Sequence, residues 1–196
     1  MIRIAVLVSG GGTNLQALID ADNPYGEIAL VVSSKKDVYA LERARLAGIP
    51  SEVVPKKKYG AGFAAKLIET LRERRIDLIV LAGYLTILPP EVIREYDRRI
   101  VNIHPALLPS FGGIGMYGLA VHEAALARGV KVTGATAHYV NEIADGGKII
   151  AQKAVGVREG DTPQVLQKRV MEEAEWVILP ETVRKICKQL TEESDR

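Results

Sequence analysis

A short segment, Asn102-Ile103-His104-Pro105, carries the residue types that acyl-transfer chemistry needs. Asn102 and His104 are two residues apart, and in an extended chain such side chains project from the same side of the backbone. The Asn102 amide is an uncharged hydrogen-bond donor, and the His104 imidazole titrates near neutral pH. A carbonyl that becomes a tetrahedral oxyanion needs a donor and a group that moves a proton. The segment therefore predicts a catalytic pair; the alternative is an ordinary hydrogen-bonded histidine in a polar loop.

A second candidate is the glycine-rich stretch Ser9-Gly10-Gly11-Gly12-Thr13-Asn14, which follows an apolar run and precedes a helical pattern. Glycines let the backbone turn sharply and approach a ligand, and the amides at a helix N-terminus favour an anion. The third, spaced glycine of a dinucleotide fingerprint is missing, and so is the Gly-Lys-Ser/Thr of a P-loop. We expect a site for a small phosphate ester here. The alternative is a tight turn with Thr13 as N-cap.

A third candidate is Asp145, which begins the sequence Asp145-Gly146-Gly147 a few residues after His138. A glycine-bounded turn can bring its carboxylate against an imidazole from elsewhere in the chain. Such a carboxylate would stabilise the charged form of His104 and raise its pKa, making it an acid at neutral pH. The alternative is an aspartate that caps its own turn. His138 is expected either to support the site or to be purely structural.

The elements that must position these residues alternate in type along the chain. Nearly continuous apolar runs predict strands at 2–8, 28–33, 51–54 and 77–81, and helical spacing predicts helices at 14–20, 38–47 and 62–75. This alternation predicts an α/β fold, doubly wound, with a mostly parallel sheet and helices on both faces. Ligands of such folds bind beyond the carboxyl ends of strands, where both polar segments fall.

The later part of the chain does not continue this alternation of strands and helices. Residues 131–140 and 149–157 predict two more strands, and 162–189 predicts a long helical region interrupted at Pro180. Residues 191–196 are expected to be a frayed polar tail. Because no linker or repeat is present, we expect a single domain over residues 1–196.

Composition narrows the class of protein. Hydrophobic residues make up 47% and charged residues 26% of the 196, and the net charge is +2, so neither nucleic acid nor a membrane is an expected partner. The single cysteine, Cys187, and the absence of a secretory leader favour a reducing, cytoplasmic location. The three histidines lack metal-ligand spacing and Cys187 has no partner, so no metal is expected.

Several motifs together resemble one family. They are Ser-Gly-Gly-Gly-Thr-Asn-Leu-Gln from Ser9, Leu-Ala-Gly-Tyr-Leu-Thr-Ile-Leu from Leu81, Asn-Ile-His-Pro-Ala-Leu-Leu-Pro from Asn102, and His-Tyr-Val from His138 leading to Asp145. This set is similar to the phosphoribosylglycinamide formyltransferase family, from Met1 to about Pro180. The Asn-x-His-Pro segment is common to folate formyltransferases, and the glycine-rich start narrows the resemblance to the ribonucleotide enzymes.

The resemblance implies an activity and a set of roles. The formyl group of 10-formyltetrahydrofolate, a cosubstrate, would pass to the amine of glycinamide ribonucleotide in de novo purine (IMP) biosynthesis. The implied catalytic residues are Asn102, His104 and Asp145. The implied ribonucleotide-binding residues are Gly11, Gly12, Thr13, Asn14 and Glu175. The implied folate-binding residues are Leu85, Thr86, Ile87, Leu88, Asn102, Val140, Asn141 and Asp145, acting largely through backbone groups.

Some positions depart from the family pattern. The family often has Arg where Thr86 and Gly60 stand, and Lys56, Lys57 or Lys58 would have to compensate for the lost anchors. Ala106 replaces a common Ser, Trp176 a common His and Lys148 a common Pro. The glycine-rich stretch 111–118 is either an active-site flap or an ordinary connecting loop.

Other functions are alternatives to the ribonucleotide enzyme. One is another folate-dependent enzyme, such as formyltetrahydrofolate hydrolase, which needs no phosphate loop, or methionyl-tRNA formyltransferase, which needs a further domain. The other is a phosphoribosyl-binding module without catalysis, which would leave Asn102, His104 and Asp145 idle. The expected partners are small-molecule substrates, and the sequence leaves open whether the chain forms a homodimer.

Overall fold

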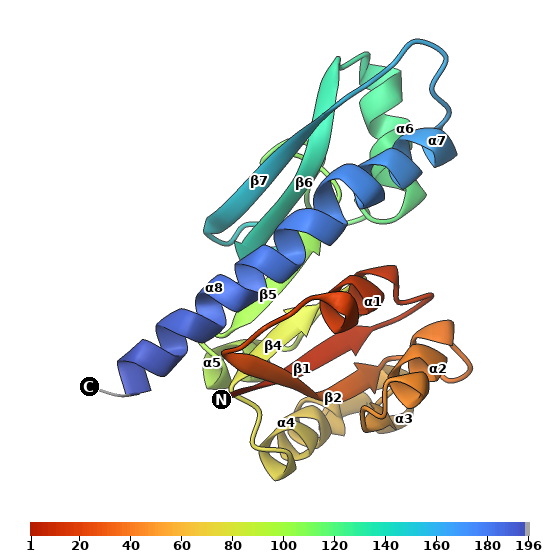
Figure 1. Ribbon diagram of the computed structural model, residues 1–196. Helices are drawn as coiled ribbons and strands as arrows, with labels where there is room; N and C mark the ends of the chain where they lie inside the picture. Colours follow the sequence, from red (N-terminus) through yellow and green to blue (C-terminus); the bar gives the residue numbers. More distant parts are fainter. Residues whose placement is uncertain (195–196) are drawn as a thin grey trace. The chain divides into compact units, whose positions relative to one another are not determined.

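The computed structural model describes residues 1–194 of the chain. Its seven strands form one sheet in the order β3-β2-β1-β4-β5-β6-β7. The pairs β1/β2, β1/β4 and β2/β3 are parallel, whereas β6/β7 is antiparallel (Figure 1). The predicted α/β class with a mostly parallel, helix-covered sheet is confirmed.

The strands are β1 (Ile2–Val8), β2 (Gly26–Ser33), β3 (Ser51–Val53), β4 (Leu78–Leu81), β5 (Ile100–His104), β6 (Val132–Tyr139) and β7 (Ile149–Gly156). The α-helices are α1 (Thr13–Asp20), α2 (Tyr39–Leu46), α3 (Lys56–Tyr59), α4 (Phe63–Glu73), α5 (Pro90–Glu95), α6 (Leu119–Arg128), α7 (Pro163–Val170) and α8 (Trp176–Ser194). A 3-10 turn, η1 (Gly60–Gly62), precedes α4, and a π-helical turn, η2 (Met171–Glu175), separates α7 from α8.

The chain divides into two compact units. The first comprises Met1–Val101 with Val183–Arg196, and the second comprises Asn102–Thr182. The single domain expected over residues 1–196 stays a prediction. Each unit is described by itself below.

The first unit is built on strands that are buried on both faces. Residues 5–8 of β1 and 78–80 of β4 have no exposed surface, which is typical of parallel strands covered by helices on both sides. The helices supply fully buried side chains such as Leu15 of α1 and Leu67 of α4. Burial of each such leucine contributes about 1.5–3 kcal/mol, so the helices hold the strand ends in place.

The turn between β1 and α1 depends on a glycine. Gly12 is the N-cap of α1 with φ of 73°, a left-handed conformation, and a Cβ there would lie 2.7 Å from Cβ of Ala40 in α2. Any larger residue would strain the backbone and collide with α2. Thr13 is the first residue of α1 rather than its N-cap, so the simple capping explanation of this segment is wrong.

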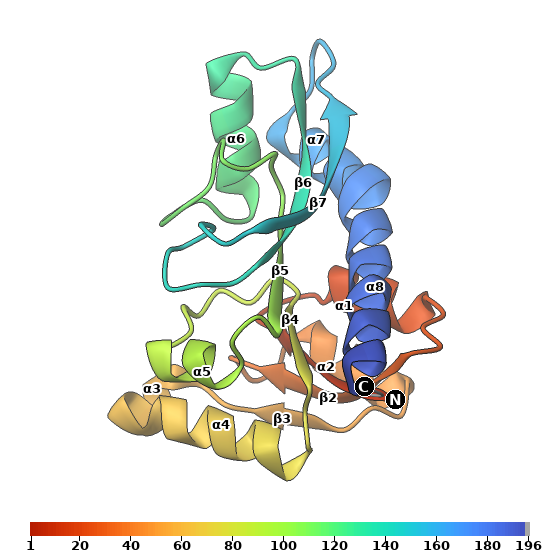
Figure 2. The ribbon, with the colours of Figure 1, turned by 90° about the vertical axis from the view of Figure 1, so that its left-hand side faces the viewer.

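The second unit is built around the antiparallel pair β6/β7, which lie side by side in Figure 2. The turn η2 packs against both strands, and α6 packs against α7. A Cβ on Gly134 of β6 would lie 2.0 Å from the carbonyl oxygen of Lys153 in β7, so this strand needs a glycine for its close pairing.

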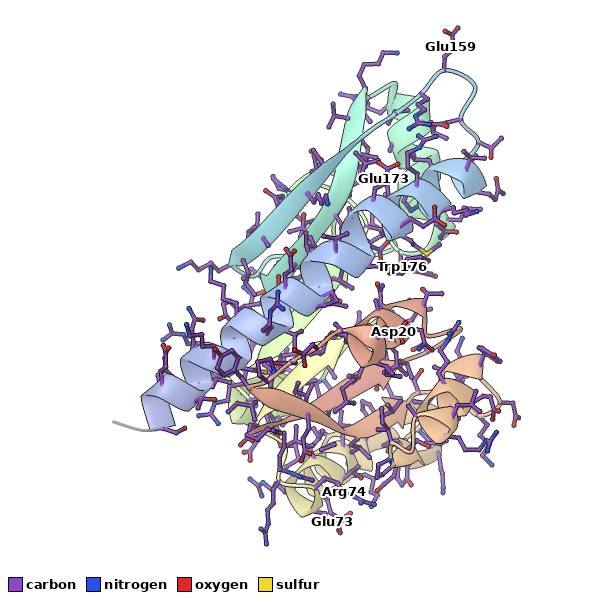
Figure 3. All side chains as sticks on the ribbon, viewed as in Figure 1. Asp20, Glu73, Arg74, Glu159, Glu173 and Trp176 are labelled. Carbon is purple, nitrogen blue, oxygen red and sulfur yellow. The ribbon has the colours of Figure 1, made fainter. Side chains whose placement is uncertain are left out.

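The C-terminal helical region corrects one expectation. The predicted interruption at Pro180 is wrong, since α8 continues through this residue. Proline lacks the N–H that would bond the carbonyl four residues earlier, here that of Trp176, the first residue of α8. The irregular turn η2 ends directly before it, between the labelled Glu173 and Trp176 of Figure 3. The missing bond therefore falls at the start of α8. The polar tail is helical as far as Ser194, and residues 195–196 lie outside the described chain.

Candidate active site

The end of β5 carries the candidate catalytic pair, Asn102 and His104. Asn102 and His104 are residues of β5 itself rather than of the loop after it, and Ile103 between them is buried. Side chains two apart on a strand lie on the same face. The strand therefore holds the amide and the imidazole at fixed spacing.

His104 is engaged at both ring nitrogens. Its Nε2 lies 2.8 Å from the carbonyl oxygen of Phe111, and its Nδ1 lies 3.5 Å from Oδ2 of Asp145. A carbonyl oxygen only accepts, so Nε2 carries a proton and donates it. The side chains of His104 and Asp145 are 4% and 15% exposed, so this pair is largely shielded from water.

Asn102 joins the pair to a second histidine. Its Nδ2 lies 3.1 Å from Nε2 of His138 and 3.5 Å from Oδ1 of Asp145. Nδ1 of His138 donates to the carbonyl of Tyr139 over 2.9 Å, so in the neutral ring Nε2 accepts from Asn102. The structure thus brings Asn102, His104, His138 and Asp145 into one cluster.

Asp145 is held by its backbone and by the loop that follows β5. It has φ of 54°, an uncommon left-handed conformation for a non-glycine residue. Its Oδ2 accepts from the amide of Gly113 over 2.8 Å. A Cβ on Gly112 would lie 3.3 Å from the Cβ of Asp145. The start of the 111–118 stretch is therefore tied to the cluster, whereas Ile114 and Tyr117 are exposed.

The electrostatics of His104 differ from the sequence expectation. Burial lowers the pKa of His104, and the opposing effects of Asp145 and of the Phe111 carbonyl do not restore it to 6.5. The expected rise in its pKa is therefore wrong, because desolvation of the charged ring outweighs the carboxylate. Burial raises the pKa of Asp145, but its contact with His138, the hydrogen bond from the Gly113 amide and the charge of His104 outweigh this and lower it. Asp145 is thus a carboxylate at neutral pH.

In the first unit, the glycine-rich turn is braced by an arginine. Nε of Arg43 donates to the carbonyl of Gly11 over 2.8 Å, and its Nη1 donates to Gln16 of α1 over 2.9 Å. The amide of Ala40 donates to the carbonyl of Gly10 over 3.2 Å. These contacts turn carbonyls of the stretch toward α2 and place a cation beside it. Asn14 is buried on the first turn of α1.

The segment after β4 is anchored to the same turn. The amide of Leu85 donates to Oγ of Ser9 over 2.9 Å. Leu85 and Ile87 are exposed, whereas Leu88 is buried. Burial raises the pKa of Tyr84 to about 12. Thr86 belongs to the same segment, so an uncharged side chain stands where the family often has Arg.

Comparison with known proteins places this chain in a family. The sequence profile of formyl transferases matches residues 2–183. The chain belongs to the formyl transferase family. The phosphoribosylglycinamide formyltransferase of Arabidopsis thaliana, named as chloroplastic, is 44% identical over 193 residues, which cover 95% of this chain and 66% of that protein. The human trifunctional purine biosynthetic protein adenosine-3 is 42% identical, over 94% of this chain and 18% of its own length.

Solved structures agree with these relatives. Glycinamide ribonucleotide transformylase 1 from Symbiobacterium toebii has a TM-score of 0.90 and 42% identity, over 96% of this chain and 89% of that chain. Phosphoribosylglycinamide formyltransferase from Anaplasma phagocytophilum has a TM-score of 0.87 and 38% identity, over 96% and 88%. The chain spans about two thirds or less of the plant and animal relatives.

The family resemblance also implied roles for Val140, Asn141 and Glu175. Oδ1 of Asn141 accepts from the amide of Ile143 and its Nδ2 donates to the carbonyl of Gly146, so its side chain shapes the loop that presents Asp145. Val140 directly precedes this loop. Glu175 is buried at the end of η2.

Sequence reasoning missed the residues that support the cluster and the glycine turn. Arg43, and the backbone groups of Phe111 and Gly113, touch the candidate site residues directly. Thr136 and Gln152 hold the chain just beyond His104. Backbone contacts leave no signal in side-chain types, and the others come from distant positions in the chain.

Among residues 1–194, no group of three or more His, Cys, Asp or Glu side chains stands where it could hold a metal ion. Within the same residues, no helix is long and apolar enough to span a membrane.

Proposed function

We propose that this formyl transferase moves the formyl group of 10-formyltetrahydrofolate to the amine of glycinamide ribonucleotide, in de novo purine (IMP) biosynthesis. The observation that carries the proposal is the cluster of Asn102, buried His104 and partly buried Asp145 at the end of β5. The printed names of relatives that match nearly all of this chain support the choice of substrates.

The reaction follows from the chemistry of the cluster. The amine nitrogen attacks the formyl carbon and forms a C–N bond, while the carbonyl oxygen becomes an oxyanion. Asn102 and the Nε2–H of His104 donate to this oxyanion once they exchange their present acceptors. The bond to the folate nitrogen then breaks, and the proton lost by the amine reaches that nitrogen. Holding two substrates together and preorganising the donors account for most of the acceleration.

The protonation state of His104 changes during the proposed reaction. Burial keeps the ring predominantly neutral in the free protein at neutral pH. A negative oxyanion beside the ring favours its charged form, so the ring takes up the proton that the amine loses as the tetrahedral intermediate forms, and the folate nitrogen receives this proton when the intermediate collapses. Asp145 then faces the newly protonated Nδ1 and keeps the ring oriented.

Substrate binding is assigned as follows. The ribonucleotide contacts Gly11, Gly12, Thr13, Asn14 and Glu175. The folate contacts the backbone of Leu85, Thr86, Ile87 and Leu88, together with Val140 and Asn141. Arg43 adds positive charge beside the phosphate turn. A cytoplasmic location, the absence of a metal and a homodimer stay untested; the plant relative is named as chloroplastic.

One assay separates this function from its alternatives. The purified protein is mixed with 10-formyltetrahydrofolate, with and without glycinamide ribonucleotide, and loss of the formyl group is followed by absorbance. We expect turnover only when both substrates are present. Turnover without the ribonucleotide would instead identify a hydrolase. Binding of the ribonucleotide by calorimetry without any turnover would identify a binding module.

A further inference from the structure

A buried threonine lies at the centre of a hydrogen-bond network next to the cluster. Oγ1 of Thr136, on β6, donates to the carbonyl of Ala106 over 2.6 Å and accepts from the amide of Leu108 over 3.0 Å. Nε2 of Gln152, on β7, donates to the same hydroxyl over 3.0 Å and to the carbonyl of Leu108 over 2.9 Å. Thr136 and Gln152 are direct partners across the β6/β7 pair.

The network uses the full capacity of the hydroxyl. A threonine hydroxyl has one hydrogen and two lone pairs. The Leu108 amide and the Gln152 amide nitrogen can only donate, so they take both lone pairs, and the single hydrogen goes to the carbonyl of Ala106. Thr136 has no exposed surface, so water does not substitute for it, whereas Gln152 lies on the exposed side of the network.

The chain just beyond Leu108 contacts both His104 and Asp145. Three residues beyond Leu108, the carbonyl of Phe111 accepts from His104. Five residues beyond it, the amide of Gly113 donates to Asp145. A Cβ on Gly112 would lie 2.5 Å from Cδ2 of Leu108, so Leu108 also packs against the chain between these two contacts.

We propose that Thr136, assisted by Gln152, is a positioning residue for the reaction, because it clamps residues 106–108 and thereby sets the loop whose backbone orients His104 and Asp145. Its side chain does not contact the reacting atoms. Its effect passes through the carbonyl of Phe111 and the amide of Gly113. The kinetic consequence rests on the proposed function, whereas the effect on the His104 ring does not.

The chain offers a matched set of variants. Thr136→Val keeps the shape and removes the hydroxyl, and Thr136→Ser keeps the hydroxyl. Thr133→Val is the control, since Thr133 lies on the same strand, is 2% exposed, and its Oγ1 has no hydrogen-bond partner among the described residues. Gln152→Met removes one donor at the exposed side and serves if Thr136→Val fails to fold.

Two measurements test the proposal in the full-length protein. In steady-state assays we expect Thr136→Val to lower kcat about 10- to 100-fold with little change in either KM, because small misplacement of catalytic groups is costly. Thr136→Ser should restore most of kcat, and Thr133→Val should match the wild type. Gln152→Met should show a smaller loss in the same direction.

The second measurement is independent of formyl transfer. An NMR titration of the imidazole signals reports the pKa of His104, whose titratable neighbours are Asp145, His138 and His122. Loosening the loop admits water, so in Thr136→Val the pKa should rise toward 6.5, and in Thr133→Val it should not move. Wild-type kcat and titration in Thr136→Val, or equal impairment in Thr136→Ser, would overturn the proposal. If the wild type lacks turnover but the pKa of His104 still rises in Thr136→Val, the proposed function is refuted and the positioning role of Thr136 is supported.

Discussion

The carbonyl oxygen of Phe111 lies 2.8 Å from Nε2 of His104, and this contact decides which nitrogen of the ring titrates. Since Nε2 must carry a proton to donate, the proton that comes and goes is the one on Nδ1. That atom faces Oδ2 of Asp145 at 3.5 Å. A backbone group seven residues away in the chain therefore directs the imidazole toward its carboxylate.

The first prediction concerns removal of that carboxylate. Asp145 favours the charged form of His104, although burial of the ring is the larger effect. Asp145→Asn should therefore lower the pKa of His104 further below its wild-type value, as measured by NMR titration. We also expect kcat to fall by roughly 100-fold, because the imidazolium of the intermediate loses its partner.

A control separates this effect from general loss of negative charge. Glu142→Gln removes another carboxylate of the same loop, one that is exposed to solvent, where water screens its charge. It should leave the titration unchanged. A rise in the pKa of His104 in Asp145→Asn would contradict the assigned interaction.

The second prediction concerns Asn102. Its amide donates within the cluster and is expected to donate to the oxyanion during the reaction. Asn102→Ala should lower kcat by about 100-fold or more, since one preorganised donor is lost. Calorimetry should show nearly unchanged affinity for the ribonucleotide, and His104→Ala should behave similarly. Near-normal turnover in both variants would remove the cluster from the mechanism.

The third prediction concerns the brace on the glycine-rich turn. Arg43→Gln loses the charge and weakens the contact to the carbonyl of Gly11. The KM for the ribonucleotide should rise about 10-fold, the loss of one charge-assisted contact, while kcat changes little. Arg45→Gln is a matched control on the same helix, where Arg45 is exposed and pairs with Glu42. Equal effects of the two changes would show that general charge matters rather than the brace.

The sequence predicts the strands and the positions of the polar site residues better than it predicts the pKa values of those residues. Continuous apolar runs such as 78–81 reveal buried parallel strands, and the polar residues after or within them mark the carboxyl ends. The sign of the pKa shift of His104 depends on burial by residues from several elements, which periodicity does not report. Thr136 bonds Leu108 and Ala106, which lie 28 and 30 residues before it in the chain, so no local sequence pattern predicts these contacts. The prediction at Pro180 was wrong because α8 begins only four residues before it, so the hydrogen bond that proline cannot make falls at the start of the helix.

The last prediction concerns stability and pH. His122, on α6, has no exposed surface, and neither ring nitrogen has a hydrogen-bond partner among the described residues. Burial, with a smaller effect of His104, lowers its pKa from 6.5 to about 4. Above pH 6.5 the ring is neutral whether the chain is folded or unfolded. Between 6.5 and about 4 only the unfolded chain binds the proton, so stability is lost as the pH falls.

The size of this loss can be measured. One pKa unit corresponds to about 1.4 kcal/mol, so the difference between 6.5 and about 4 corresponds to roughly 3 kcal/mol of unfolding free energy. Urea unfolding at neutral pH and near pH 4 should show His122→Leu losing much less stability on acidification than the wild type. Val121→Ala, a cavity-forming change at the neighbouring buried residue, should lower stability equally at both pH values. If His122→Leu kept the full pH dependence of the wild type, the loss would have to originate in other groups, of which His104, whose pKa is shifted in the same direction, is the first to examine.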